Sequence, residues 1–219
     1  MDSLAGWLFF TRWGNSVLLL PVAACLGAGL WLTGERGIAW RWATCFGTSV
    51  LLVLATKVAF LGWGVGIAYL DFTGISGHSM LAAAVLPTFA WWAAQERLPA
   101  VQRRAVVATS LLALVVGVSR VALSTHSVAE VVAGLALGTL VTLVVVPRDT
   151  IATNRTALRW VVLAALLTAG MLPGAGTSDE AHGVVVRLAL ALSGRQVPYD
   201  RSVFDQRAHA QRRGAMTAS

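Results

Sequence analysis

Charged residues are scarce in this chain of 219 residues, making up 12% of the sequence against 57% for hydrophobic residues. A soluble domain usually carries about twice that charged fraction. The few charges are also unevenly spread, so that long stretches contain none. This scarcity excludes an ordinary water-soluble domain and favours a protein embedded in a lipid bilayer.

A basic stripe with interleaved aromatic residues, which would indicate nucleic-acid binding, is also missing, although the net charge is +7. The basic residues lie between apolar runs and in the C-terminal tail, a placement typical of topology control and of contact with anionic lipid. Many of the nine Trp lie near the ends of apolar runs and fit an interfacial aromatic belt. We therefore predict the bilayer, and no nucleic acid, as a partner.

Apolar segments predict an all-α fold, a polytopic membrane helix bundle of about six transmembrane helices. A short aromatic segment at 4–13 predicts an N-terminal interfacial helix, and 182–193 predicts a surface helix. The chain therefore divides into a helical membrane domain at 1–173 and an amphipathic segment with a basic tail at 174–219. The six predicted spans are 15–32, 42–64, 79–94, 105–118, 128–146 and 158–172. The fifth contains Gly134 and Gly138, a small-xxx-small spacing that allows close helix packing.

The distribution of arginine predicts the orientation of these spans. The connections after the first, third and fifth spans are rich in Arg, which places them in the cytoplasm by the positive-inside rule. The connections after the second and fourth spans then face outward, which at a bacterial inner membrane means the periplasm. The Arg-rich tail would lie outside as well, against the rule.

Ionisable residues gather in or beside the spans on this outward side. Charges at membrane depth are costly, so they need partners or a function. Two separate connections contribute them, and the topology brings both to the same face. The residues are Lys57, Asp71, His78, Arg120, His126 and Glu130.

Lys57 is the only lysine in the chain, against sixteen arginines, and it lies inside the apolar run LLVLATKVAFLGW. One interpretation is a lysine near a helix end whose ammonium group reaches the membrane surface. The interpretation we favour is a compact cation directed inward at an anion.

The turn SGHSM, residues 76–80, comes just before the third span. Gly77 allows close backbone approach, and the N–H groups that open a helix form an anion site. His78 lies in that first turn, where an imidazolium could give a proton to a departing alkoxide.

The third cluster is SRVALSTHSVAE, residues 119–130. The guanidinium of Arg120 can pair with phosphate oxygens. His126 and Glu130 are four residues apart and share a helix face. A carboxylate there can hold the Nδ1 proton and leave Nε2 free to attack, as in a catalytic triad with His as the nucleophile.

These residues resemble the type-2 phosphatidic acid phosphatase family, which shares its site with acid phosphatases and vanadium haloperoxidases. The family's motifs are K-x6-R-P, P-S-G-H and S-R-x5-H-x3-D, and they correspond here to Lys57, to ISGH and to SRVALSTHSVAE. The order and spacing agree over the region 57–130, within a similarity that covers roughly 10–146.

The resemblance implies a role for each matching residue. His126 would be the nucleophile that forms a phosphohistidine, Glu130 would orient it, and His78 would be the general acid. The phosphate oxygens would be held by Lys57, Arg120, Ser76 and Gly77. No metal or other cofactor is implied, because cationic side chains and helix N–H groups can neutralise the phosphoryl charge.

The chain departs from the family pattern at several positions. Gly64 and Val65 stand where the first motif has Arg-Pro, Ile75 replaces Pro, and Glu130 replaces Asp. The missing arginine could be replaced by the backbone of GWGVG, residues 62–66, or by a distant arginine of the tail. Asp71 belongs to none of the motifs and is a possible accessory residue, pairing with Lys57 or His78 or binding a substrate hydroxyl.

Three functions are compatible with the sequence. The leading one is a membrane phosphatase acting on a lipid phosphate monoester or pyrophosphate. The second is a family member of weak or absent activity that binds lipid phosphate. The third is a transporter, which the clustering of charges at one face and the lack of an inverted repeat disfavour. The motifs indicate recognition of the phosphoryl group. They do not identify the lipid that carries it or the oligomeric state.

Overall fold

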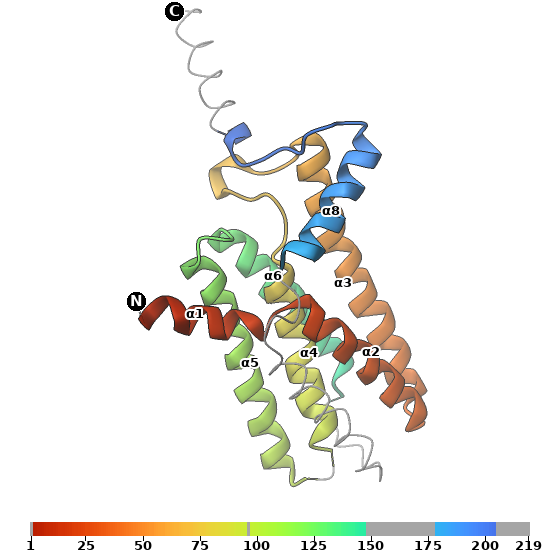
Figure 1. Ribbon diagram of the computed structural model, residues 1–219. Coiled ribbons are helices and arrows are strands. Elements are labelled where there is room, and N and C mark those ends of the chain that lie inside the picture. The colour runs from red at the N-terminus through yellow and green to blue at the C-terminus, as the bar shows by residue number, and fades with distance from the viewer. Residues whose placement is uncertain (1, 96, 148–177, 205–219) are drawn as a thin grey trace, which may run out of the picture.

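The computed structural model describes residues 2–95, 97–147 and 178–204, and these form a bundle of helices (Figure 1). No strand occurs within these ranges. One 3-10 turn, η1, interrupts the connection between α3 and α4. In chain order the elements are α1 Asp2–Arg12, α2 Ser16–Leu32, α3 Arg36–Trp63, η1 Ala68–Leu70, α4 Gly77–Ala93, α5 Pro99–Ala122, α6 Val128–Val145 and α8 Ser178–Ser193.

Helix α4 forms the centre of the bundle and packs against α2, α5 and α6. Between positions 79 and 92, only Leu86 and Ala90 are partly exposed. Its surface is made of small residues, including a run of three buried alanines at 82–84. Small side chains let neighbouring backbones approach closely, which supplies the packing energy that the hydrophobic effect does not provide within a membrane.

Gly134 and Gly138 bring α6 directly against α4. A Cβ on Gly134 would lie 2.5 Å from the Ser76 carbonyl oxygen, and one on Gly138 would overlap the carbonyl oxygen of Met80. The prediction that this spacing allows close helix packing is therefore confirmed. The Thr142 hydroxyl donates to the Ala83 carbonyl oxygen at 2.9 Å and adds a polar tie across the same interface.

The outer faces of the helices are apolar. On α5, Val107, Leu111, Leu114 and Val118 are exposed at helical spacing and form one stripe. Among the described residues, four helical stretches are long and apolar enough to cross a membrane: Leu4–Leu32, Arg36–Trp63, Pro99–Ala122 and Val128–Val145. The predicted class, an all-α membrane bundle, is confirmed, and the chain is an integral membrane protein.

The individual helices agree with most of the predicted segments. Helices α2 to α6 lie at the first five predicted spans, while the sixth, 158–172, falls outside the described residues. The apolar stretch Leu4–Leu32 divides at a turn around Gly14, so that α1 is a separate helix lying across the bundle axis (Figure 1). The helix predicted at 182–193 is present as α8, which packs against α3.

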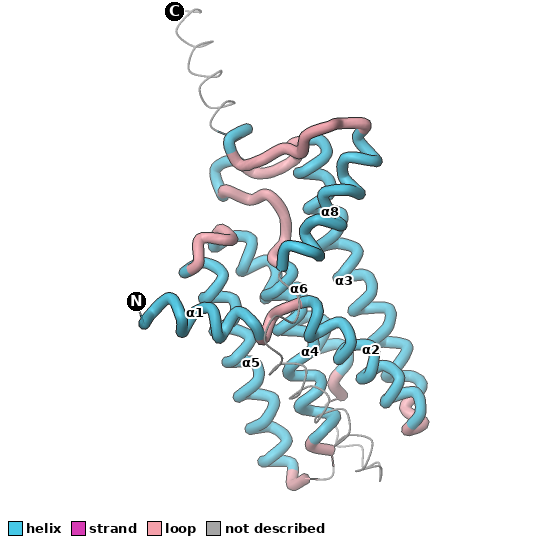
Figure 2. Tube along the Cα trace, in the orientation of Figure 1, coloured by secondary structure: helices cyan, strands magenta, loops and turns pink. Residues whose placement is uncertain are grey.

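The longer loops lie at one end of the bundle. Figure 2 shows the connection between α3 and α4 and the segment after α8 together at the end where α3 terminates. Gly64 ends α3 in the left-handed conformation, at φ 67°, and its N–H donates to the Phe60 carbonyl oxygen at 2.7 Å. The first turns of α4 and α6 and the last turn of α5 point to this end, which therefore collects their functional side chains.

The close approach of α4 and α6 generates a stability prediction. Gly138→Ala should lower the free energy of unfolding by about 1–3 kcal/mol, because the added methyl overlaps the backbone of α4. Thermal unfolding of the detergent-solubilised protein measures the change. Gly47→Ala is the matched control, since a Cβ at Gly47 meets nothing within 4 Å. Equal melting temperatures for the two variants would contradict this account of the interface.

Candidate active site

A cavity of about 610 Å³ opens at the loop end of the bundle. Helices α3, α4 and α5 each contribute a basic side chain to its wall, and the loop between α5 and α6 contributes another. The polar residues lining it that the sequence singled out are Lys57, Gly77, His78, Arg120 and His126. The structure therefore brings together side chains that are as much as 69 residues apart in the sequence, as the motif spacing predicts.

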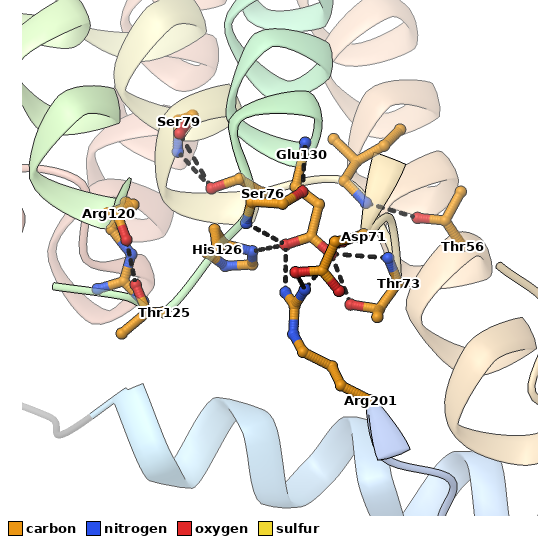
Figure 3. Close-up of polar contacts among 12 residues, drawn as sticks. Thr56, Asp71, Thr73, Ser76, Ser79, Arg120, Thr125, His126, Glu130 and Arg201 are labelled. Atoms are coloured by element: carbon orange, nitrogen blue, oxygen red, sulfur yellow. Dashed lines mark hydrogen bonds and ion pairs between the residues drawn. The ribbon is translucent and has the colours of Figure 1, made fainter. Parts of the chain in front are cut away.

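His126 and Glu130 form a short polar contact in the site (Figure 3). The Nδ1 atom of His126 lies 2.6 Å from Oε2 of Glu130. This contact leaves Nε2, the opposite ring nitrogen, available for another partner. The predicted arrangement of a histidine oriented by a carboxylate one helical turn later is therefore present.

The start of α6 fixes this carboxylate. Ser127 is the N-cap of the helix, and its hydroxyl accepts a hydrogen bond from the Glu130 N–H at 3.3 Å. In return, Glu130 Oε2 accepts from the Ser127 N–H at 3.2 Å, which completes a capping box. The S-x-x-E pattern that encodes this motif is readable in the sequence, but the sequence interpretation did not use it.

Thr73 holds the other oxygen of Glu130. Its backbone N–H and its hydroxyl donate to Oε1 at 2.7 and 2.6 Å. The loop that carries Thr73 lies on α3, where the Ile75 N–H donates to the Thr56 hydroxyl at 3.2 Å. At Gly74, with φ of 152°, a Cβ would come within 3.1 Å of the Lys57 side chain. No sequence signal pointed to Thr73, because its position follows from the path of the loop.

Arg120 connects the loop between α5 and α6, which carries His126, with the N-terminal helix α1. Its Nη1 donates to the Thr11 hydroxyl of α1 at 2.9 Å. Its carbonyl oxygen accepts from the backbone N–H groups of Thr125 and His126 at 3.1 and 3.3 Å, and from the Thr125 hydroxyl at 2.9 Å. The α5–α6 loop is thus wound onto the end of α5, which sets His126 beside Arg120. Thr11 was missed because it is distant in sequence.

Two residues predicted for the site have other surroundings. The Ser76 hydroxyl is fully buried, lies 2.9 Å from the Ser79 hydroxyl and caps α4, so it does not line the cavity. Asp71 is exposed and pairs with Arg201, a residue after α8, in place of Lys57 or His78. Among the described residues, the Lys57 ammonium makes no hydrogen bond or ion pair, which leaves it available to an anion in the cavity.

The position of the missing first-motif arginine is occupied by the end of a helix. Gly64 terminates α3, and Val65 beyond it is exposed. Residues 62–66 do not line the cavity, whereas Arg201 does. Of the two replacements considered, only the arginine from the C-terminal region reaches the site.

Burial lowers the pKa of His126, and the charges of Lys57 and Arg120 lower it further. The hydrogen bond and the negative charge of Glu130 act in the opposite direction but do not outweigh burial. The neutral imidazole therefore persists to lower pH than it would in an exposed histidine. A neutral ring with Nδ1 held by a carboxylate is the form that attacks an electrophile through Nε2.

Comparison with known proteins agrees with this geometry. Residues 68–154 match the family model described as the PAP2 superfamily. Phosphatidylglycerophosphatase B of Bacillus subtilis is 32% identical over 137 residues, which cover 59% of this chain and 67% of that protein. The chain belongs to the PAP2 superfamily.

Two further similarities were found. An uncharacterized 22.5 kDa protein in the cps region of Klebsiella pneumoniae is 44% identical over 133 residues, or 60% of this chain. The chain spans 64% of the length of that relative. The crystal structure of the first transmembrane PAP2 type phosphatidylglycerolphosphate phosphatase from Bacillus subtilis aligns with a TM-score of 0.48 and 28% identity, covering 66% of this chain and 73% of that one.

The electrostatics of this PAP2 site generate a titration prediction. Glu130→Gln should lower the pKa of His126 below its value in the wild type, because the carboxylate that favours the imidazolium is lost. The histidine NMR resonances of the solubilised protein report this titration, with His126 assigned by its absence from His126→Ala. A higher His126 pKa in Glu130→Gln would contradict the assigned pairing.

Proposed function

We propose that this PAP2 protein is a membrane phosphatase that hydrolyses a lipid phosphate monoester or pyrophosphate through a phosphohistidine on His126. The observation that carries the proposal is the 2.6 Å contact between His126 Nδ1 and Glu130, beside a cavity lined by Lys57 and Arg120. This set supplies a nucleophile, a carboxylate that orients it and two cations for phosphate oxygens.

In the first step, Nε2 of His126 attacks phosphorus and the bond from phosphorus to the leaving oxygen breaks. The leaving oxygen takes a proton from His78, which lies in the first turn of α4 on the same cavity wall. In the second step, water attacks the phosphohistidine and gives a proton to His78. Inorganic phosphate leaves, and the enzyme returns to its starting form.

The cations supply the stabilisation that phosphoryl transfer requires. Charge spreads over the equatorial oxygens in the transition state, so fixed positive groups lower its energy more than that of the ground state. Lys57 provides a point charge and Arg120 a planar fork. The N–H groups opening α4 at Gly77 add a third source. These residues account for the charge neutralisation without a metal ion.

The apolar wall of the cavity supports a lipid as the substrate. Side chains of α2, α3 and α4 form it, including Leu20, Val53 and Leu81. The bacillary relative's name gives phosphatidylglycerophosphate as its substrate. We infer a phosphate carried on a lipid headgroup, with the acyl or isoprenyl part lying against this wall.

The positive-inside rule supports a location in the bacterial inner membrane with the site facing the periplasm. The connections on the opposite side carry the arginines, such as Arg103 and Arg104 at the start of α5. The outward face therefore receives the phosphate group of an outer-leaflet lipid.

A second candidate function is lipid-phosphate binding with weak or absent turnover. One observation favours it: at Gly64, where the family has an arginine, the chain has no side chain and α3 ends. Binding without release of phosphate would be its signature.

Replacing the nucleophile tests the catalytic proposal. His126→Ala should lower the rate of phosphate release from a lipid phosphate by at least about 1,000-fold, because no other histidine among the described residues of the cavity wall is paired with a carboxylate. Vanadate, which mimics the phosphoryl transition state, should inhibit the wild type in the absence of added metal. Equal phosphate release by wild type and His126→Ala would refute the assignment, and binding without release by the wild type would favour the second function.

The general acid has its own test. His78→Ala should retain binding of the lipid phosphate and slow cleavage by about 100-fold or more for a poor leaving group. The loss should shrink for an aryl phosphate, whose leaving oxygen needs no proton. Weaker binding with unchanged turnover would contradict the role of His78.

A further inference from the structure

The segment that follows α8 returns to the active site. We call residues 194–204 the return segment. It delivers Arg201 to the cavity, where Nη2 donates to Oε2 of Glu130 at 2.9 Å (Figure 3). Nη1 donates to the carbonyl oxygen of Asp71 at 2.8 Å and forms an ion pair with the Asp71 carboxylate.

A backbone hydrogen bond and apolar contacts also hold the return segment, independently of Arg201. The Tyr199 N–H donates to the Leu61 carbonyl oxygen at 2.9 Å. The rings of Phe204 and Phe60 lie with centroids 5.6 Å apart. Gly66 makes room for Phe204, since a Cβ there would lie 2.7 Å from the ring. Truncating Arg201 should therefore leave the segment in place.

The contacts of Arg201 do not suit a phosphate ligand. Both terminal nitrogens are occupied by two carboxylate-bearing residues, which together carry more negative charge than the guanidinium carries positive. Glu130 Oε2, in contrast, is shared between Arg201 and Nδ1 of His126. Arg201 therefore acts on the nucleophile through the carboxylate.

We propose that Arg201, held by Asp71, is a positioning residue that fixes the Glu130 carboxylate against His126 and makes the return segment part of the active site. This inference rests on the proposed function for its kinetic readout. It gives Asp71 a role that no family motif contains, and it gives one arginine of the basic tail a specific task.

The fork of Arg201 restricts Glu130 in two ways. It fixes the direction of Oε2, so that the His126 ring keeps one orientation. The guanidinium also places a positive charge beside Oε2 of Glu130. Without it, the negative charge of this oxygen would stabilise only the protonated ring of His126. Removing the guanidinium should therefore favour protonated His126 and raise the pKa of that ring.

The other charged and titratable groups around His126 are kept in every Arg201 variant, so Arg195→Ala is needed to show that a shift comes from Arg201. They come from every element around the cavity. They are Lys57 on α3, the Asp71 loop residue, His78 on α4, Arg120 on α5, Glu130 on α6, His182 on α8 and Asp200 of the return segment.

The experiment compares Arg201→Ala, Arg201→Lys and Asp71→Asn with the matched control Arg195→Ala. Arg195 is an exposed arginine of the same segment that contacts Tyr199 and Val197 and, within the described part of the chain, no acidic group. Arg201→Ala should lower kcat by about tenfold, the usual strength of a charge-assisted hydrogen bond, with KM nearly unchanged. The acidic limb of its pH–rate profile should move to higher pH.

Arg201→Lys keeps the charge and loses the fork, so its acidic limb should stay at the wild-type position while kcat recovers only in part. Asp71→Asn removes a negative charge while the backbone contact keeps Arg201 beside Glu130. Its acidic limb should therefore not move to higher pH as that of Arg201→Ala does. Arg195→Ala should match the wild type in all of these measurements.

Histidine NMR titration of the solubilised variants separates this inference from the proposed function. The His126 resonance should titrate at higher pH in Arg201→Ala than in the wild type, and this result does not depend on turnover. A wild type without phosphatase activity would refute the proposed function and leave this shift to be observed. An unshifted His126, the same shift in Arg195→Ala, or a raised KM with unchanged kcat in Arg201→Ala would each overturn the positioning role.

Discussion

The buried carboxylate of Glu130 organises the loop end of this membrane bundle. An uncompensated charge among apolar helices would be strongly destabilising, so the carboxylate requires hydrogen-bond donors. Thr73, His126, Ser127 and Arg201 supply five, from the α3–α4 loop, the α5–α6 loop and the return segment. Three segments that are distant in sequence therefore donate hydrogen bonds to the two carboxylate oxygens of Glu130. The orientation of the His126 ring depends on these contacts.

The cations of the site complement this arrangement. Arg120 is fixed by Thr11, while Lys57 approaches from α3 without a partner among the described residues. Both cations line the cavity, whereas Glu130 is fully buried and is hydrogen-bonded to His126 and Arg201. Under the proposed function, a phosphate in the cavity would meet these cations and not the Glu130 carboxylate.

Much of the fold could be predicted from the sequence because a bilayer requires long apolar helices with internally satisfied backbones. Five spans and the packing glycines Gly134 and Gly138 were located in this way. The pairing of His126 with Glu130 was also accessible from their separation of four residues. The expected shared helix face is wrong, because His126 precedes the N-cap Ser127 and reaches Glu130 from the loop. These predictions rest on local periodicity, which survives in any tertiary arrangement.

The rest of the site depends on contacts between distant segments, which no local pattern encodes. Thr11 reaches Arg120 across 109 residues, and Arg201 reaches Glu130 across 71. Ser76 shows how local structure changes the surroundings of a motif residue. Its place in the second motif predicts a phosphate contact, whereas in the structure its hydroxyl caps α4 and lies buried beside Ser79. Arg201 was foreseen only as one of several tail arginines, because nothing in the composition of the tail distinguishes it from Arg195.

The glycine contact between α4 and α6 also has a consequence for enzyme engineering. His78 stands on α4 and Glu130 on α6, and the two helices touch backbone to backbone at Gly134 and Gly138. The separation of His78 and Glu130 is therefore set by the scaffold. Under the proposed function, a mutant library aimed at a new lipid should leave these two helices intact and diversify the apolar positions of α2 and α3, where shape can change without moving either residue.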